Sequence, residues 1–134
     1  MKEFSTTWKR SKKPRKQRKY RYNAPLHIKG KFMHAHLSKE LRQKYGTRSL
    51  RVRVSDKVKV LRGQYKGLVG KVEKVNLAYN YIYVEKAEFT KKDGTTLKYP
   101  INPSNVVILD IETDDKTRKK ILERKQKEKS EAGK

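Results

Sequence analysis

The most informative stretch of this 134-residue chain is Asp56-Lys-Val-Lys-Val-Leu-Arg-Gly-Gln-Tyr-Lys-Gly-Leu-Val-Gly-Lys-Val-Glu-Lys-Val75. Near each end, valines alternate with charged residues, a period of two that is typical of half-buried strands. The segment between carries three glycines and three cations: Gly63, Gly67, Gly70, Arg62, Lys66 and Lys71. Glycine permits positive φ and leaves backbone N–H groups open to close approach. Flanking cations favour a polyanion as the approaching group.

This order of strand, glycine- and lysine-rich loop, and strand resembles a KOW motif, the RNA-associated unit of small β-barrels in ribosomal and transcription proteins. Strand patterns are expected at residues 58–61, 69–75, 81–85, 86–90, 97–101 and 106–109, with Asp93-Gly94 as a hairpin turn. We therefore expect a mainly β fold, a small SH3-like (KOW) barrel of about five strands over residues 51–110. Its predicted core is Val58, Val60, Val72, Val75, Ile82, Val84, Leu97, Ile101, Val106 and Ile108.

The composition predicts a polyanionic partner. Lysine and arginine number 37 against 14 acidic residues, a net charge of +23, whereas solubility of a small domain asks for only about 2–8. Nucleic acid is the commonest such partner, with an anionic membrane as the alternative. No apolar run approaches the roughly 20 residues of a spanning helix, so no membrane anchor is expected. The absence of cysteine excludes disulfides and thiolate metal sites and fits a cytoplasmic protein.

Most of the positive charge lies before the predicted barrel. Residues 1–54 hold 18 basic and 2 acidic residues, net +16. Residues 1–24 are too poor in apolar side chains to fold alone, and we expect a disordered arm that folds on RNA. A solvated tail and a nuclear-localisation patch are the alternatives. Arginines in the arm can form bidentate hydrogen bonds to phosphates. Trp8, Tyr20 and Tyr22 offer aromatic faces on which unpaired bases can stack.

Residues 25–50 are expected to form a short helical extension, with Pro25 in a first helical turn. Ser38 is the predicted N-cap of a second short helix, and Gly46 its stop. In residues 111–134, Asp114 and Asp115 favour the start of a charged helix over 116–128. Its only apolar residues are Ile121 and Leu122, so we expect a solvated helix that frays or lies on a partner.

No arrangement for catalysis or cofactor binding is recognisable, and neither a metal nor a homo-oligomer is expected. The three histidines lack carboxylate or cysteine partners at ligand spacing, so base stacking or phosphate binding is favoured over zinc. The cations and rings predicted to bind RNA are Lys12, Lys13, Arg15, Lys16, Arg18, Lys19, Tyr20, Arg21, His27, Lys29, Lys31, His34, His36, Arg42, Arg48, Arg51, Arg53, Arg62, Lys66 and Lys71, with Gly63, Gly67 and Gly70 forming the KOW loop.

Several runs in order along residues 9–125 resemble the universal large-subunit ribosomal protein family number twenty-four, in its archaeal and eukaryotic form. They include Ser11-Lys-Lys-Pro-Arg-Lys-Gln-Arg18, Asn23-Ala-Pro-Leu-His27, Leu37-Ser-Lys-Glu-Leu-Arg-Gln-Lys-Tyr45, Asn102-Pro-Ser-Asn105 and Arg118-Lys-Lys-Ile-Leu-Glu-Arg124. The first run resembles the archaeal form more closely. Two departures stand before the first strand: Arg51 where proline is common in the family, and Ser55 where glycine is common.

The resemblance implies a structural protein of the cytoplasmic large subunit that binds rRNA near its 5′ end, helps to start subunit assembly and lies near the polypeptide exit tunnel. Neighbouring ribosomal proteins would be its other partners. The alternative is a transcription-elongation KOW module that docks on RNA polymerase. Such modules usually follow a mixed α/β domain, which residues 1–54 are too basic and too poor in apolar side chains to supply.

Overall fold

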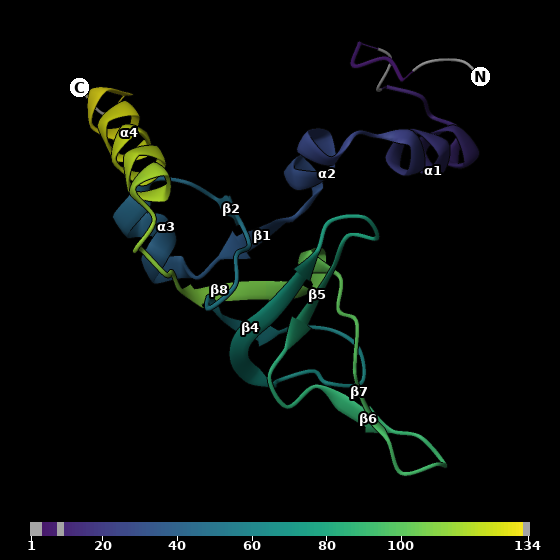
Figure 1. The fold of residues 1–134 in the computed structure, drawn as a ribbon. Helices are drawn as coiled ribbons and strands as arrows, with labels where there is room; N and C mark the ends of the chain where they lie inside the picture. Colours follow the sequence, from purple (N-terminus) through teal and green to yellow (C-terminus); the bar gives the residue numbers. More distant parts are fainter. Residues whose placement is uncertain (1–3, 8–9, 133–134) are drawn as a thin grey trace.

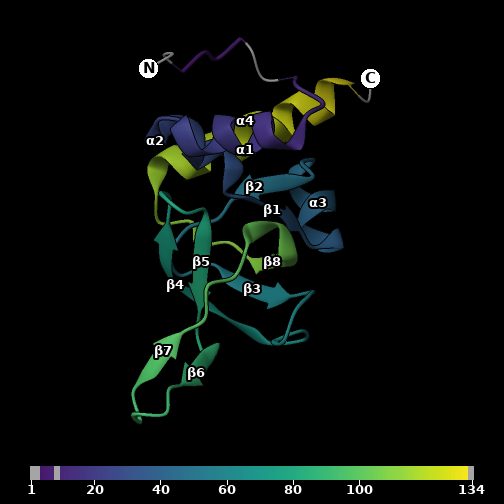
Figure 2. The ribbon, with the colours of Figure 1, turned by 90° about the vertical axis from the view of Figure 1, so that its right-hand side faces the viewer.

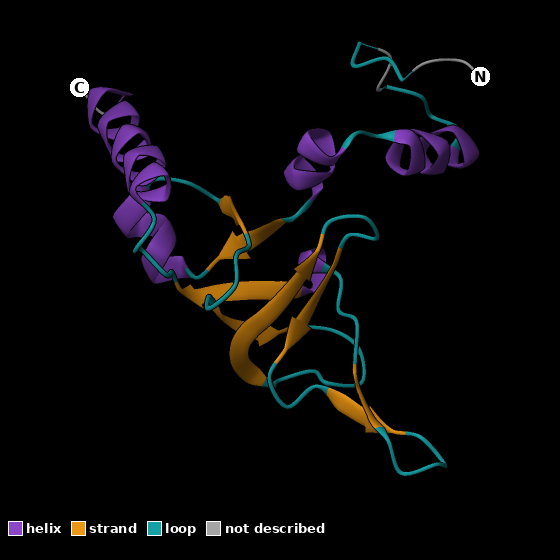
Figure 3. Cartoon of the chain, in the orientation of Figure 1, coloured by secondary structure: helices purple, strands orange, loops and turns teal. Residues whose placement is uncertain are grey.

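The structure, a computed structural model, describes residues 4–7 and 10–132. Most strands join one mixed sheet in the order β2-β1-β8-β3-β4-β5, and a separate hairpin projects from one end (Figures 1 and 3). The sheet consists of β1 (His34–Leu37), β2 (Ser49–Arg51), β3 (Lys57–Val60), β4 (Val69–Asn76), β5 (Tyr81–Val84) and β8 (Val106–Asp110). The hairpin is β6 (Glu88–Thr90) with β7 (Thr96–Lys98).

The helices frame this sheet. They are α1 (Pro14–Asn23), α2 (Leu26–Phe32), α3 (Lys39–Tyr45) and α4 (Lys116–Ala132), with a 3-10 turn η1 (Pro103–Asn105) before β8. Helices α1 and α2 lead away from the sheet on one side, and α4 rises beside α3 on the other (Figure 1). None of the helices within the described residues is long and apolar enough to cross a bilayer.

The predicted pair of strands around the glycine loop is confirmed as β3 and β4. Their antiparallel register places Lys57 opposite Lys71 and Val58 opposite Gly70. The alternation of charged and apolar residues matches the exposure: Val58 and Val60 are buried, and the lysines between them face solvent. The structure is thus a small β-rich domain in which four helices accompany the mixed sheet.

At the β5 edge of the sheet, Ile82 exchanges two backbone hydrogen bonds of 2.9 Å with Ile101. The strand pairs of the described residues do not themselves close a barrel, so the SH3-like barrel stays a prediction. Of the predicted core, Val75 is half-buried, and Leu97 was wrongly included because it lies exposed on the projecting hairpin. Its strand pairs only with β6, so the alternating pattern there does not face the main sheet.

Residues 25–50, expected to hold only short helices, also contribute two strands. In β1 the sequence His34-Ala-His-Leu37 alternates exposed and buried, and Ala35 and Leu37 are almost completely buried. This strand pairs antiparallel with β2 and parallel with β8. The core therefore begins before the predicted barrel region, with Met33 fully buried. Alternation over only four residues is a weak signal, and the partner β8 is distant in sequence.

Helix α3 confirms the predicted caps. The Ser38 hydroxyl accepts a hydrogen bond of 3.3 Å from the backbone N–H of Leu41. Gly46 takes φ +64° at the other end, and its N–H donates to the carbonyl of Arg42. These contacts satisfy backbone groups that a helix leaves free at its ends, so local sequence specifies both boundaries.

Helix α4 begins at a buried ion pair that the sequence did not reveal. Both terminal guanidinium nitrogens of Arg118 contact the carboxylate of Asp56, at 2.6 and 2.7 Å, and both residues are almost completely buried. The carboxylate also accepts from the backbone N–H groups of Arg53 and Glu112. Leu122, one turn further on, is also buried. The helix, expected to be solvated along its length, is thus anchored at its start.

The Asp56–Arg118 pair fixes the turn before β3. Arg118 also donates to the backbone carbonyl groups of Arg51 and Glu112, at 3.2 and 3.0 Å. Within this turn Ser55 adopts φ +71°, a left-handed conformation that costs a residue with a Cβ roughly 1 kcal/mol. The glycine common in the resembled family would adopt it without that cost.

The first helix differs from the expected disorder. Residues 14–23 form α1, although none of its residues is buried. Pro14 occupies the first turn, where its missing N–H has no helical partner to lose, and lysine, arginine and glutamine are good helix formers. Composition predicts correctly that the segment lacks a core, but not that a helix forms. Trp8 lies outside the described residues.

Candidate nucleic-acid interface

Helix α1 presents the predicted basic arm on its surface. The predicted cations of the arm are all exposed: Lys12, Lys13, Arg15, Lys16, Arg18, Lys19 and Arg21. Tyr22 is 81% exposed, whereas Tyr20 is half-buried between two other rings. Its centroid lies 4.8 Å from that of Phe4 and 6.3 Å from that of Phe32. Aromatic contacts join α1 to α2, and α1 itself buries no residue.

Helix α2 connects this arm to the sheet. Its His27 and Lys31 are exposed, and Lys29 donates a 3.2 Å hydrogen bond to the carbonyl of Ala78 in the β4–β5 turn. Gly30 also allows a close contact between α2 and β2, because a Cβ at this position would lie 2.8 Å from a guanidinium nitrogen of Arg51. The missing side chain of this glycine lets the cation lie directly against the helix.

The outer face of β1 and β2 continues the positive surface. His34 and His36 both point away from the core, and His34 pairs across the ladder with Arg51. Partial burial, and secondarily the charge of Arg51, lower the pKa of His34 below the usual value for histidine. The neutral form of His34 is therefore favoured, in which one ring nitrogen can donate a hydrogen bond and the other can accept one.

Some predicted RNA-binding arginines already have internal partners. Arg42 donates a 2.8 Å hydrogen bond to the carbonyl of Leu37, which ties α3 to the end of β1. Arg53 forms an ion pair with Asp115, which also caps α4 by accepting from the N–H of Thr117. These contacts confirm the helix-start role predicted for Asp115. Arg48 is exposed.

The KOW loop joins β3 to β4 and is closed by its own hydrogen bonds. Gly63 and Gly67 both have φ +93°, as a loop rich in glycine predicts. The N–H groups of Lys66, Gly67 and Leu68 donate to carbonyl oxygens within or beside the loop. The expectation that glycine leaves these N–H groups open to phosphate is thus wrong at Gly67. The cations Arg62 and Lys66 remain exposed, so the loop offers side chains to an anion.

Gly70 was wrongly assigned to the KOW loop, because it lies within β4 opposite Val58. A Cβ at this position would lie 3.0 Å from the carbonyl oxygen of Glu85 and 3.0 Å from a methyl group of Val84. Its role is close packing between β4 and β5. The neighbouring Lys71 is exposed and lies opposite Lys57.

The structure brings some predicted residues together and separates others. The arm, α2 and the outer face of β1–β2 lie at one end of the sheet (Figure 2). The KOW loop lies away from α1 and contacts the projecting hairpin, where the Tyr65 hydroxyl donates to the carbonyl of Glu88 at 2.5 Å. Two separate basic surfaces result. Sequence reasoning missed Lys57 and Lys59, although their alternation with valine shows that both face solvent.

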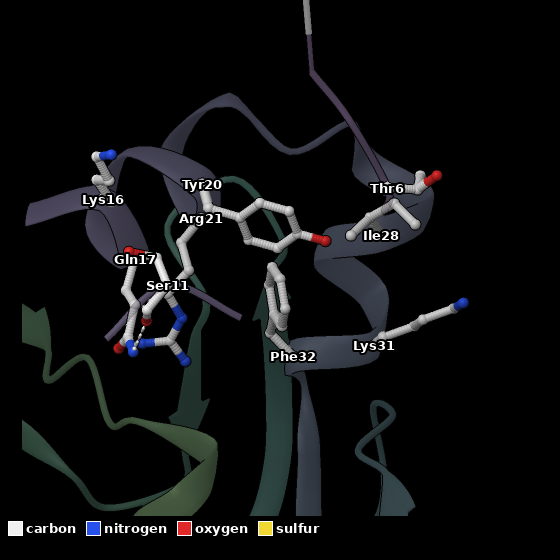
Figure 4. A pocket seen from close by; sticks show the side chains of 9 residues that line it. All are labelled: Thr6, Ser11, Lys16, Gln17, Tyr20, Arg21, Ile28, Lys31 and Phe32. Carbon is white, nitrogen blue, oxygen red and sulfur yellow. Dashed lines mark hydrogen bonds between the residues drawn. The ribbon is translucent and has the colours of Figure 1, made fainter. Parts of the chain in front are cut away.

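A pocket of about 460 Å³ lies between α1 and α2 (Figure 4). Aromatic and aliphatic side chains of Tyr20, Phe32 and Ile28 line it, together with several cations and polar groups. Sequence reasoning identified Tyr20 as a stacking residue but not Phe32, whose ring contacts it. The sequence did hold one clue to Phe32, because this residue falls in the segment predicted to be helical.

Comparison with known proteins places these features in context. The family model described as the eukaryotic ribosomal proteins L26 and their archaeal counterparts matches residues 11–125. The large ribosomal subunit protein uL24 of Methanosarcina barkeri is 55% identical over 108 residues, which cover 81% of this chain and 93% of that protein. The uL24 protein of Pyrobaculum islandicum is 50% identical over 115 residues, covering 86% of this chain and 94% of the relative.

Proposed function

The chain belongs to the family of the eukaryotic ribosomal proteins L26 and their archaeal counterparts, and from this membership we propose that it binds large-subunit rRNA directly. The family is structural and not enzymatic, which agrees with the lack of any recognisable catalytic arrangement in the sequence. Its members belong to the large ribosomal subunit in the cytoplasm. A ribosomal structural role is therefore the function of this chain.

Direct binding to rRNA is supported by the distribution of charge over the fold. The arm exposes a dense set of cations on a helix that buries nothing, which is an unfavourable arrangement unless an anion compensates it. His34, Arg51 and the exposed lysines of β3 extend the positive surface onto the sheet. The single observation that carries the proposal is the exposed positive charge of α1, because this helix holds its cations at the surface and adds nothing to the core.

The finer details rest on the family resemblance. We propose that the binding site lies near the 5′ end of the large rRNA, that the protein helps to start subunit assembly, and that it lies near the polypeptide exit tunnel among other ribosomal proteins. The paired strands β8-β3-β4-β5, with Ile101 bridging to β5, support a KOW barrel of SH3-like type as the unit that presents the loop.

Salt dependence of binding tests this proposal. If about 6–10 phosphates are neutralised, the affinity for transcribed large-subunit rRNA should fall by roughly 10³–10⁵ between 50 and 200 mM salt. Filter binding at several salt concentrations gives the log–log slope. A slope near zero would contradict an electrostatic contact with phosphates. Crosslinking followed by sequencing of the attached RNA would locate the site along the rRNA.

A further inference from the structure

The pocket between α1 and α2 combines an apolar wall with a cationic rim. Its wall is formed by Tyr20, Phe32 and Ile28, and cations stand around it: Lys16, Arg21 and Lys31 (Figure 4). Its volume of about 460 Å³ lies within the range of roughly 300–1,000 Å³ that is usual for small-ligand sites. The pocket is thus large enough for one flat organic group with a charged substituent.

The two rings are arranged by contacts within the arm. Tyr20 and Phe32 meet edge to face at an interplanar angle of 65°. The guanidinium of Arg21 lies over the Phe32 ring, 5.4 Å from its centroid. Tyr22, two residues after Tyr20, is 81% exposed and does not line the pocket. The half-buried ring of Tyr20 is therefore positioned before any ligand arrives.

The chemistry of this lining favours a nucleotide over other ligands. An aliphatic ligand would make no use of the positive charge at the rim, and an inorganic anion would make no use of the rings. A nucleobase can stack on tyrosine, phenylalanine or an arginine plane, and its phosphate is attracted by lysine and arginine. The side-chain amide of Gln17, which also lines the pocket, can both donate to and accept from a base edge.

We propose that this pocket binds one unpaired nucleotide of the rRNA, with its base against Tyr20 and Phe32 and its phosphate among Lys16, Arg21 and Lys31. The inference rests on the proposed function and adds a specific recognition site to it. Such a nucleotide must leave its stack, and contact with the two rings would compensate that loss. Helix α1 would then be fixed by the RNA on the side where the protein provides no core.

The test compares three full-length variants with the parent protein on transcribed large-subunit rRNA. Tyr20→Leu keeps apolar packing but removes the aromatic face, and Tyr20→Phe restores that face. Tyr22→Leu is the matched control on the same helix, outside the pocket. Tyr20→Leu should weaken binding by about 5- to 150-fold, the range measured for loss of one stacked base. Tyr20→Phe should bind nearly as the parent does, and Tyr22→Leu, which removes an exposed ring outside the pocket, should lose less affinity than Tyr20→Leu.

A second readout identifies the contact directly. After ultraviolet irradiation of the complex, mass spectrometry should find a nucleotide attached to Tyr20 or Phe32. The salt slope of Tyr20→Leu should equal that of the parent, because no charge is removed. Circular dichroism should show that both Tyr20 variants melt as the parent does, so that reduced affinity reflects the missing ring.

The outcomes separate this inference from the function on which it rests. If the parent binds rRNA with a steep salt slope but Tyr20→Leu binds equally well, the pocket is refuted and the rRNA-binding function stands. If the parent shows no salt-dependent binding, the function itself fails. Equal losses in Tyr20→Leu and Tyr22→Leu would also overturn the pocket. Competition by free adenosine monophosphate at the concentration of the RNA would assign the pocket to a free nucleotide instead.

Discussion

The sheet with α4 and the arm of α1 and α2 are held in place by different forces. In the sheet, Val58, Ile82 and Ile108 are completely buried, and the Asp56–Arg118 pair closes one end. In the arm, α1 buries no residue and contacts α2 through aromatic rings. The sheet is specified by its own sequence, whereas the arm carries charge whose counterpart must come from another molecule. Stability and binding should therefore respond to mutations in different regions.

The largest expected effect on stability is at the buried ion pair. Arg118→Ala leaves the Asp56 carboxylate buried and unpaired, which should lower the free energy of unfolding by about 3–5 kcal/mol. Arg124→Ala, which removes an exposed cation from the same helix, should change it by less than about 0.5 kcal/mol. Denaturant melts of both variants measure the difference. Equal stability of the two would show that the pair does not anchor α4.

Removal of residues 1–22 should separate the two regions most clearly. Cooperative melting should persist, because the core begins with Met33 and the arm buries nothing in α1. Affinity for rRNA at about 0.2 M salt should fall by at least roughly a hundredfold, since each phosphate that is no longer neutralised reduces the log–log slope by about 0.9. Circular dichroism and filter binding check the two halves. Loss of cooperative melting would show that the arm belongs to the folding unit.

The KOW loop allows geometry and charge to be separated within one short segment. Gly67→Ala should lower stability by about 1 kcal/mol because of its φ of +93°, and Gly67→Val should lower it more. Open space surrounds the added Cβ, and the N–H already donates to Val60, so affinity should change less than stability.

Lys66→Ala is the counterpart to these glycine variants, because it removes charge and leaves the backbone conformation alone. Its stability should match the parent, with a log–log salt slope reduced by about 1 if Lys66 neutralises one phosphate. Melting temperatures and rRNA affinities of the three variants measure both effects. If all three bind as the parent does at every salt concentration, the loop only connects two strands.

The smallest effect should be a gain in stability. Ser55→Gly removes the backbone strain of a side chain in the left-handed region but raises the conformational entropy of the unfolded chain. A net stabilisation of about 0.5 kcal/mol is therefore expected. Ser104→Gly, at an exposed position where φ is not positive, should destabilise the protein by about 0.5–1 kcal/mol. Thermal melts of the two serine variants give the sign directly. Destabilisation by Ser55→Gly would show that its side chain is needed in the turn.

Local patterns in the sequence predicted those elements that depend on interactions between residues near each other in the chain. The β3–β4 pair follows from valines that alternate with charges, and α3 from Ser38 and Gly46. Contacts between distant residues could not be predicted this way. The pairing of β1 with β8, and of Asp56 with Arg118, depends on how the sheet folds back on itself. A single sequence contains no signal that links such positions.

The candidate interface shows the same limit. Exposure of the arm's cations followed from its composition, but the internal partners of other predicted cations did not. The ion pair of Arg53 with Asp115 and the hydrogen bond of Arg42 to Leu37 each depend on tertiary placement. The closed N–H groups of the KOW loop depend on backbone geometry, which glycine content alone does not fix. The pocket needed both α1 and α2 in place.

The Asp56–Arg118 pair also constrains the order in which parts of the chain can fold during synthesis. Its partners are separated by 62 residues, so a growing chain meets Asp56 long before Arg118 is made. Parallel pairing of β1 with β8 imposes the same delay, and such distant contacts form slowly. The basic arm precedes every strand of the sheet and needs no core, so it is available to RNA while the sheet is incomplete. The proposed binding to rRNA could therefore begin with the arm, before the buried pair can close.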